Sequence, residues 1–204
     1  MAGNETGRRH SRDDVAEAAL RILDDLGLPD LTMRRLASAL DVQPSALYWH
    51  FPNKQTLLAE LADRIVAARR PAANATSADD APWQDAVRSE ADALRDALLS
   101  YRDGAEVVSS TLALGLGSPE TVDRLAAAVA RGGFDAETSR RAATALLHFV
   151  LGHVSHEQQR IQYDSLGVLA DQPASPLDED DPAAAFAFGV GLLIGGLELS
   201  RSRR

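Results

Sequence analysis

The sequence predicts an all-α fold divided into two helical domains. Apolar residues recur at intervals of three and four along most of the 204 residues, and no stretch of useful length shows the alternation of a strand. Between two sets of expected helices, residues 71–82 consist of alanine, proline and small polar or acidic residues, a composition typical of linkers. We therefore expect one domain over residues 1–70, a linker over 71–82 and a second domain over 83–204.

The first expected helix begins after Ser11, which can cap it while Asp14 completes a capping box. Gly27 ends it, because glycine favours a helix C-terminus. One side of this helix is apolar and is expected to face the core through Val15, Ala19, Ile22, Leu23 and Leu26.

Residues 32–54 predict two short helices joined by a tight turn and followed by the start of a further helix. The first directs apolar residues inward at helical spacing, namely Met33, Leu36, Ala37 and Leu40. The second is expected from Pro44, whose fixed φ suits a first helical position, to His50. Phe51 precedes a proline and therefore avoids helical φ/ψ, and Asn53 is suited to cap the next helix. This is the layout of a helix-turn-helix DNA-binding motif.

The second short helix is rich in side chains that can hydrogen-bond phosphates or base edges. These are Ser45, Tyr48, Trp49 and His50, while Leu47 points to the core. The alternative is that Tyr48 and Trp49 are core aromatics, since aromatic residues are more often buried than functional. Adjacent helical positions point about 100° apart, so both cannot be buried with Leu47, and we expect at least one to be exposed.

The segment Leu47-Tyr48-Trp49-His50-Phe51, followed by Asn53-Lys54, resembles the DNA-binding domain of the tetracycline-repressor (TetR) family of bacterial transcription factors. Asp41 stands where that family usually has glycine, and aspartate tolerates a left-handed turn better than most residues. The resemblance implies that Arg34 reads a guanine and that Gln43 and Ser45 lie near base edges. It places Tyr48, His50 and Lys54 at phosphates. The residues expected at DNA are Thr32, Arg34, Arg35, Gln43, Pro44, Ser45, Tyr48, Trp49, His50 and Lys54.

The chain after the motif continues as helices. One is expected from Asn53 to about Arg70, connecting the motif to the rest of the protein, with Leu57, Leu58, Leu61 and Ile65 inward. The next has an apolar face made of Trp83, Val87, Ala91, Leu94, Leu98 and Tyr101. A further helix opens at Ser118-Pro119-Glu120 and closes at Gly132-Gly133, and its apolar residues are Val122, Leu125 and Val129.

Asp135 starts a longer helix that is expected to reach about Tyr163. Residues 164–183 contain glycine, proline, serine and the acidic string 178–181, and are expected to form a mobile loop. The last helix, from about Ala184 to Ser200, is apolar and carries Gly189, Gly191, Gly195 and Gly196, which cost helix propensity but allow close helix approach. It is either buried in its own subunit or forms a two-fold dimer interface.

Composition limits the possible functions. The net charge of −9 belongs to residues 71–204, because residues 1–70 carry ten basic and ten acidic side chains. A neutral domain can still present a basic face, and the expected members are Arg8, Arg9, Arg12, Arg34, Arg35 and Lys54. There is no cysteine, no run of about 18 apolar residues is found, and residues 1–10 do not resemble a secretory signal, so we expect a cytoplasmic protein without a membrane segment.

Other functions were weighed against DNA binding. His153, His156 and Glu157 have a helical spacing that could hold a metal ion, but we favour histidines that hydrogen-bond in a cavity or interface, and expect no cofactor. The sequence lacks a phosphate-binding glycine loop, a Gly-x-Ser-x-Gly elbow and a His-Glu-x-x-His motif, so an enzyme is not expected.

The similarity extends into the second domain. Trp83-Gln84-Asp85, residues 97–105, His148-Phe149 with Gly152, and Phe186-Ala187-Phe188-Gly189 resemble the regulatory domain of the tetracycline repressors. That resemblance implies a small-molecule site between helices and dimerisation through the last helix and the one that begins near Asp135. In those repressors a magnesium-tetracycline complex moves the fourth helix, and the two DNA-binding motifs then no longer match the major grooves.

The drug-binding positions differ from those of the tetracycline repressors. Val108 and Leu112 replace a magnesium-ligating histidine and an arginine, Thr111 is kept, and Glu90 and Leu94 replace an asparagine and a phenylalanine. A further histidine of those repressors corresponds to Arg70. The expected ligand-binding residues are Glu90, Leu94, Val108, Thr111, Leu112, His148, His153 and His156.

Together these observations predict an N-terminal helix-turn-helix DNA-binding domain and a C-terminal helical domain for ligand binding and dimerisation. We expect a homodimeric repressor that a mainly apolar small molecule releases from a palindromic double-stranded DNA operator, without magnesium. A ligand-independent, architectural DNA-binding dimer is the alternative.

Overall fold

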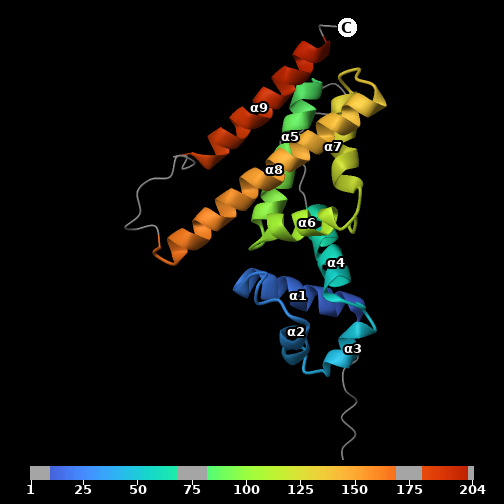
Figure 1. Cartoon of the computed structure of the whole chain (residues 1–204), viewed down its shortest axis with the longest axis vertical. Coiled ribbons are helices and arrows are strands. Elements are labelled where there is room, and N and C mark those ends of the chain that lie inside the picture. Colours follow the sequence, from blue (N-terminus) through green and yellow to red (C-terminus); the bar gives the residue numbers. More distant parts are fainter. Residues whose placement is uncertain (1–9, 69–81, 169–180, 202–204) are drawn as a thin grey trace, which may run out of the picture.

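The computed structural model describes residues 10–68, 82–168 and 181–201, and within these ranges the protein contains helices and no strand. The predicted all-α fold is confirmed (Figure 1). The helices are α1 (Arg12–Leu26), α2 (Met33–Ala39), α3 (Pro44–Tyr48), α4 (Lys54–Ala67), α5 (Trp83–Leu99), α6 (Gly104–Ala113), α7 (Glu120–Ala130), α8 (Ala136–Ser165) and α9 (Pro182–Arg201). Helices α1 to α3 form one end of the molecule, and α4 leads from them to the larger group of helices (Figure 1).

Parts of the predicted organisation fall outside the described residues. These are Arg8 and Arg9, the predicted helix end at Arg70, almost all of the linker 71–82 and most of the loop 164–183. Within that loop, residues 164–168 continue α8 and its end, and α9 begins at Pro182, two residues before the predicted start. The carboxylate of Asp181 accepts hydrogen bonds from the backbone N–H groups of Ala183 and Ala184, which explains the earlier start.

The first helix follows its capping signals. Ser11 accepts a hydrogen bond from the backbone of Asp14, and the Asp14 carboxylate accepts one from the backbone of Ser11. Gly27 ends the helix with φ 86°. The prediction that Leu26 faces the core is wrong, because its side chain lies in the last turn and is 41% exposed.

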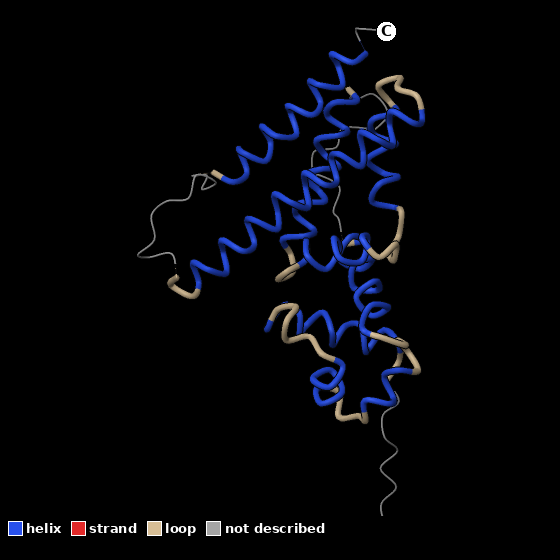
Figure 2. Tube along the Cα trace, in the orientation of Figure 1, coloured by secondary structure: helices blue, strands red, loops and turns tan. Residues whose placement is uncertain are grey.

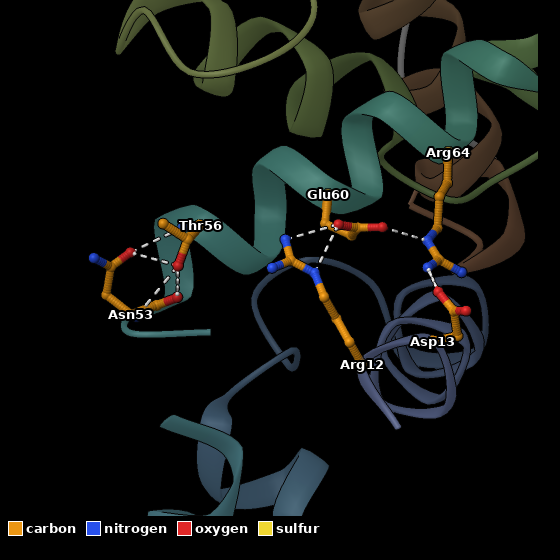
Figure 3. Close-up of polar contacts among 6 residues, drawn as sticks. All are labelled: Arg12, Asp13, Asn53, Thr56, Glu60 and Arg64. Carbon is orange, nitrogen blue, oxygen red and sulfur yellow. Dashed lines mark hydrogen bonds and ion pairs between the residues drawn. The ribbon is translucent and has the colours of Figure 1, made fainter. Parts of the chain in front are cut away.

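The helix-turn-helix is built as predicted, with one difference at its second helix. Asp41 has φ 53°, so the aspartate adopts the left-handed turn that the missing glycine would have made. Helix α3 ends at Tyr48, two residues before the predicted end, because the N–H groups of His50 and Phe51 both donate to the carbonyl of Leu47 and close the chain into a turn. Asn53 then caps α4 in a capping box with Thr56 (Figure 3).

Helix α6 was not predicted from the sequence as an element separate from α5. The expected apolar face continued to Tyr101, whereas α5 ends at Leu99 and the chain turns at Asp103, a non-glycine residue with φ 57°. Gly104 follows at a point where a Cβ would lie 2.3 Å from the carbonyl oxygen of Leu98, so only glycine fits. This turn redirects the chain and allows α6 to pack on α4 as well as on α5 and α8.

The C-terminal domain is arranged around α5 and the 30-residue helix α8. Helices α6, α7 and α9 pack against both of them, and α9 lies along the outside of the domain (Figure 2). Asp135 caps α8 as expected, and the helix reaches Ser165, slightly beyond the predicted Tyr163. The core of this domain includes Leu94, Leu98, Leu125 and Val150, all fully buried.

We expected no segment long and apolar enough to cross a membrane, and the last helix does not fit that expectation. Helix α9 meets that test by length and composition, with a mean hydropathy of 1.7, although core helices of soluble proteins also meet it. Phe186, Val190 and Ile194 form its buried face against the rest of the protomer. Its other side remains exposed, so burial within its own subunit accounts for only one face.

Candidate DNA-binding and effector sites

The short helix α3 presents its polar and aromatic side chains outward. Leu47 is buried and anchors the helix, whereas Gln43, Pro44, Ser45 and Tyr48 are exposed. Trp49 follows the helix and is 90% exposed, and His50 is half-buried. The alternative in which Tyr48 and Trp49 are core aromatics is wrong, and the expectation that at least one is exposed is confirmed.

The basic residues expected around this helix are not equivalent. Arg34 is exposed and makes no ion pair within the described part of the chain. Arg35 instead pairs with Asp30, with Nη2 and Oδ1 2.6 Å apart. Thr32 caps α2, since its hydroxyl oxygen accepts a hydrogen bond from the backbone of Arg35. Lys54 occupies the first turn of α4 and is half-buried.

Arg12 was also expected on the basic face, but its guanidinium contacts other residues of the same domain. Its guanidinium donates to Glu60 on α4 (Figure 3). It also lies 4.5 Å from the centroid of the Phe51 ring. Of the expected cations in the described residues, Arg34 and Lys54 are therefore the ones without an ion pair. The sequence did not reveal this, because Glu60 is 48 residues away from Arg12.

The residues expected to bind ligand differ in burial, and of them only His148 lines the groove described between α6 and α8. Leu94 and Val108 are buried, and the buried Thr111 hydroxyl donates within its own helix toward the carbonyls of Val107 and Val108. Leu112 is partly buried. Leu94 and Val108 thus belong to the hydrophobic core, and Leu112 packs against it.

The Glu90 carboxylate forms an ion pair that was not predicted from the sequence. Arg124 of α7 donates to both carboxylate oxygens of Glu90, each at 2.9 Å. The hydrogen bond and the charge of Glu90 raise the pKa of Arg124 above its ordinary value, despite partial burial. A bidentate pair of this kind leaves little of the Glu90 carboxylate for a ligand.

The three histidines of α8 lie in different surroundings. His148 is exposed and lines a groove of about 410 Å³ between α6 and α8. His153 packs against the rings of Phe149 and Phe186, and its Nε2 lies 3.1 Å from the carbonyl of Pro182. The Nε2 atom of His156 is buried and has no hydrogen-bond partner within the part of the chain that the structure describes. The predicted residues are thus not brought together.

These histidines do not assemble a metal site in the part of the chain that the structure describes. Glu157 pairs with Arg95 of α5 at 2.6 Å, and the described residues contain no group of three potential ligands that could hold an ion. Both side chains of this pair are largely buried, and Arg95 also lies over the ring of Phe186. Arg95 Nε and Glu157 Oε2 have no hydrogen-bond partner among the described residues. Arg95 was missed by the sequence analysis, although a charge at a core-facing position of α5 could have indicated it.

The groove between α6 and α8 differs in its lining from the expected site. It is lined by Glu106, Ser109, Ser110, Ala113, His148, Leu151, Gly152 and Ser155. Of these, the sequence analysis named only His148 as a ligand-binding candidate. The three serines gave no distinctive signal, because serine is common on the exposed faces of helices.

Helix α6 is linked to the DNA-binding domain at both ends. At its start, the Asp103 carboxylate accepts hydrogen bonds from the backbone of Leu28 at 2.7 Å and from the side chain of Gln162 at 2.5 Å. Beyond its end, the backbone of Ser118 donates to Asp63 of α4 at 2.8 Å. A movement of α6 would therefore act on both the α1–α2 loop and α4.

The comparisons with known proteins agree with this arrangement. Residues 15–61 match the bacterial regulatory proteins of the tetR family, and residues 76–167 match the tetracyclin repressor-like C-terminal domain. The tetracycline repressor protein class C of Escherichia coli is 35% identical over 203 residues, which cover 93% of this chain and 91% of that protein.

Solved structures extend the likeness to three dimensions. Mycobacterium smegmatis BioQ is 42% identical, with a TM-score of 0.80 over 92% of this chain and 97% of that one. BioQ with its natural double-stranded DNA operator is 40% identical, with a TM-score of 0.73 over 92% of this chain and 98% of that one. A single-substitution variant of TetR from Acinetobacter baumannii AYE, in complex with minocycline, is 31% identical, with a TM-score of 0.73 over 94% and 98% of the two chains.

These relatives are transcription regulators and not enzymes. The exposed recognition helix, the helical C-terminal domain and the similarity over more than nine-tenths of the chain lead to one assignment. The chain belongs to the TetR family and is a DNA-binding transcriptional regulator.

Proposed function

We propose that this regulator is a cytoplasmic repressor that binds a palindromic operator through α3 and its flanks. The observation that carries the proposal is the exposure of Trp49 and Tyr48. These large aromatic side chains with polar edges lie on the outside of a small domain. Arg34, Gln43 and Ser45 would face base edges, while Tyr48, His50 and Lys54 would hold phosphates. The relative BioQ has been solved with its double-stranded DNA operator, which supports operator binding by this regulator.

The same proposal requires a homodimer, formed by α8 and α9. On α9, Phe188, Leu192 and Leu199 are each more than 60% exposed, which is unusual for three large apolar side chains on one helix. A Cβ added at Gly191, Gly195 or Gly196 would meet nothing within 4 Å in the protomer, so space for a second helix is free there. A two-fold arrangement would bury this surface and place two α3 helices one turn of DNA apart or a multiple of it.

Substitution at two glycines of α9 tests the dimer. Gly195→Leu should block close approach of the partner and yield a monomer in light scattering, with loss of binding to a two-half-site operator. Gly189→Leu is a useful contrast, because a Cβ there would lie 2.2 Å from Phe149 and should disturb the protomer itself. A dimer that persists in the Gly195 variant would contradict this interface.

A small molecule is proposed to release the operator by acting on α6. The packed state of Leu94, Val108 and Thr111 means that a mainly apolar ligand must displace α6, or bind in the groove between α6 and α8. Either event strains the two hydrogen bonds that join α6 and its flanks to the DNA-binding domain, from Leu28 to Asp103 and from Ser118 to Asp63. A ligand achieves this only by binding the DNA-incompetent form more tightly.

The effector is expected to act without magnesium. Val108 and Leu112 cannot ligate the ion, and Glu90 is already paired with Arg124. Tetracycline should therefore be a poor inducer, even though a relative binds minocycline. The test is operator release, measured by fluorescence anisotropy, with tetracycline in the presence and absence of magnesium and with a panel of hydrophobic ligands.

The outcomes of that test are distinct. Release by a hydrophobic ligand alone supports the proposal, whereas release by low-micromolar magnesium-tetracycline overturns the interpretation of the pocket. Retention of the operator with every ligand in the panel would favour the alternative, a ligand-independent architectural DNA-binding protein.

A further inference from the structure

Four charged side chains join the first turn of α1 to the middle of α4 (Figure 3). Arg12 donates from Nε and Nη2 to one carboxylate oxygen of Glu60, at 3.1 and 2.9 Å. The other oxygen accepts from Arg64 Nε at 2.9 Å, and Arg64 Nη2 donates to Asp13 at 2.5 Å. Positive and negative side chains alternate along this network, and their four charges sum to zero.

Glu60 is the central member of this network. Partial burial acts to raise its pKa, but hydrogen bonds from Arg64 and Arg12 outweigh burial and hold the pKa below its ordinary value. The carboxylate is therefore ionised whenever the regulator is in neutral solution. Without that charge, Arg12, Arg64 and Asp13 would leave one positive charge uncompensated.

Arg12 lies where such a charge would matter. Its guanidinium stacks over Phe51, the residue that directly follows His50, and its side chain is 56% exposed. Phe51 in turn is separated by two residues from Lys54, at the start of α4. Arg12 is thus close to the chain segment through which the motif is expected to hold phosphates, but Glu60 engages the Nε and Nη2 donors of its guanidinium.

We propose that Glu60 is a specificity-determining residue, which restrains Arg12 and so limits the binding of non-operator DNA. A released arginine would add a phosphate contact on DNA of any sequence, and such contacts carry no sequence information. In non-specific complexes the protein can take any position on the DNA that allows that contact. In the operator complex, base contacts fix the position of the protein on the DNA. Loss of the Glu60 charge therefore increases non-specific binding more than operator binding.

The test uses the full-length protein and two duplexes. One is a random-sequence duplex, and the other is a duplex that the unmodified protein has selected from a random pool; both are titrated with salt. Glu60→Gln keeps the shape of the side chain and removes its charge. On the random duplex we expect several-fold tighter binding and a plot of log K against log salt steeper by up to about 0.9, the value for one added phosphate contact.

Two further variants separate this effect from a structural one. Arg12→Gln alone should leave the salt slope unchanged, and the double variant Glu60→Gln with Arg12→Gln should return to the slope of the unmodified protein. Glu137→Gln is the matched control, since it makes the same change of charge beside Arg141 on α8, far along the chain from the motif. That control should bind both duplexes as the unmodified protein does.

Two results would overturn the proposal. One is a folded Glu60→Gln variant, verified by circular dichroism, whose salt slope on random DNA is unchanged or is not restored by Arg12→Gln. The other is a shallower slope in Arg12→Gln alone, which would mean that Arg12 already contacts phosphate. This second measurement decides the question even if Glu60→Gln does not fold.

Discussion

In the N-terminal domain, the side chains that were predicted to bind DNA lie outside the core, whereas in the C-terminal domain three of the eight predicted to bind ligand, Leu94, Val108 and Thr111, are buried in it. Trp49 and Tyr48 are exposed around the buried anchor Leu47. Leu94 and Val108, in contrast, are themselves core residues. A surface that recognises DNA can be formed before its partner arrives, but a pocket for an apolar molecule would be filled by its own walls when no ligand is bound. The comparison teaches that DNA binding and effector binding place different demands on the fold.

The largest effect should come from substituting a buried residue of the N-terminal domain. A substitution at an exposed residue of the same domain gives the comparison. Phe51→Ala removes a fully buried ring and should lower the free energy of unfolding by about 3–5 kcal/mol, measured by urea denaturation. Trp49→Ala should change stability by no more than about 0.5 kcal/mol but weaken operator binding. A large loss of stability in the Trp49 variant would contradict the division between core and surface.

A comparable effect is expected at the buried ion pair of the C-terminal domain. Arg95→Met would leave the carboxylate of Glu157 buried and unpaired, and should cost about 3–5 kcal/mol in the free energy of unfolding. Replacing both residues, Arg95→Met with Glu157→Leu, should recover much of that loss because no charge is then left buried. If the double variant is no more stable than the single one, the pair is not the source of the effect.

Smaller effects should separate the DNA contacts from one another. Arg34→Ala should cost about 1–3 kcal/mol at one base position and relax the sequence preference there. Tyr48→Ala and Lys54→Ala should weaken binding across all sequences, and Lys54→Ala should also reduce the salt slope by about one because it removes a cation from a phosphate. Mobility shifts on an operator library distinguish the two patterns. Equal losses on every sequence in the Arg34 variant would place Arg34 at a phosphate.

The smallest expected effect is the pH dependence contributed by Glu60. Its pKa is lowered in the folded protein, so the stabilisation is fully present above the ordinary glutamate pKa of about 4.3 and is lost as the pH falls through the folded value. Unfolding measured across the acid range should show this loss in the unmodified protein. Glu60→Gln should lack this loss of stability at acid pH. An identical acid profile in both proteins would show that the ionised Glu60 contributes nothing measurable to stability.

The sequence by itself determined the helices of the N-terminal domain and the family. The signals for these features are local: Ser11 and Asp14, Pro44, and Asn53 act on residues within one helical turn, and the Leu47–Phe51 segment is contiguous. The exposure of at least one of two adjacent aromatics also followed from helix geometry alone. Even the aspartate at position 41 could be interpreted correctly, because tolerance of a left-handed turn is a property of the residue itself.

Only the tertiary structure decided which charges are available and whether the predicted pocket is open. Arg12 meets Glu60, Glu90 meets Arg124 and Arg95 meets Glu157 across separations of 34 to 62 residues. No periodicity within one helix records such pairings, since they depend on how the helices pack against each other. The same reason explains the missed turn at Asp103, whose left-handed backbone lies at the contact between α6, the α1–α2 loop and α8. Local preferences choose the helices, while long-range packing chooses which side chains are left to bind another molecule.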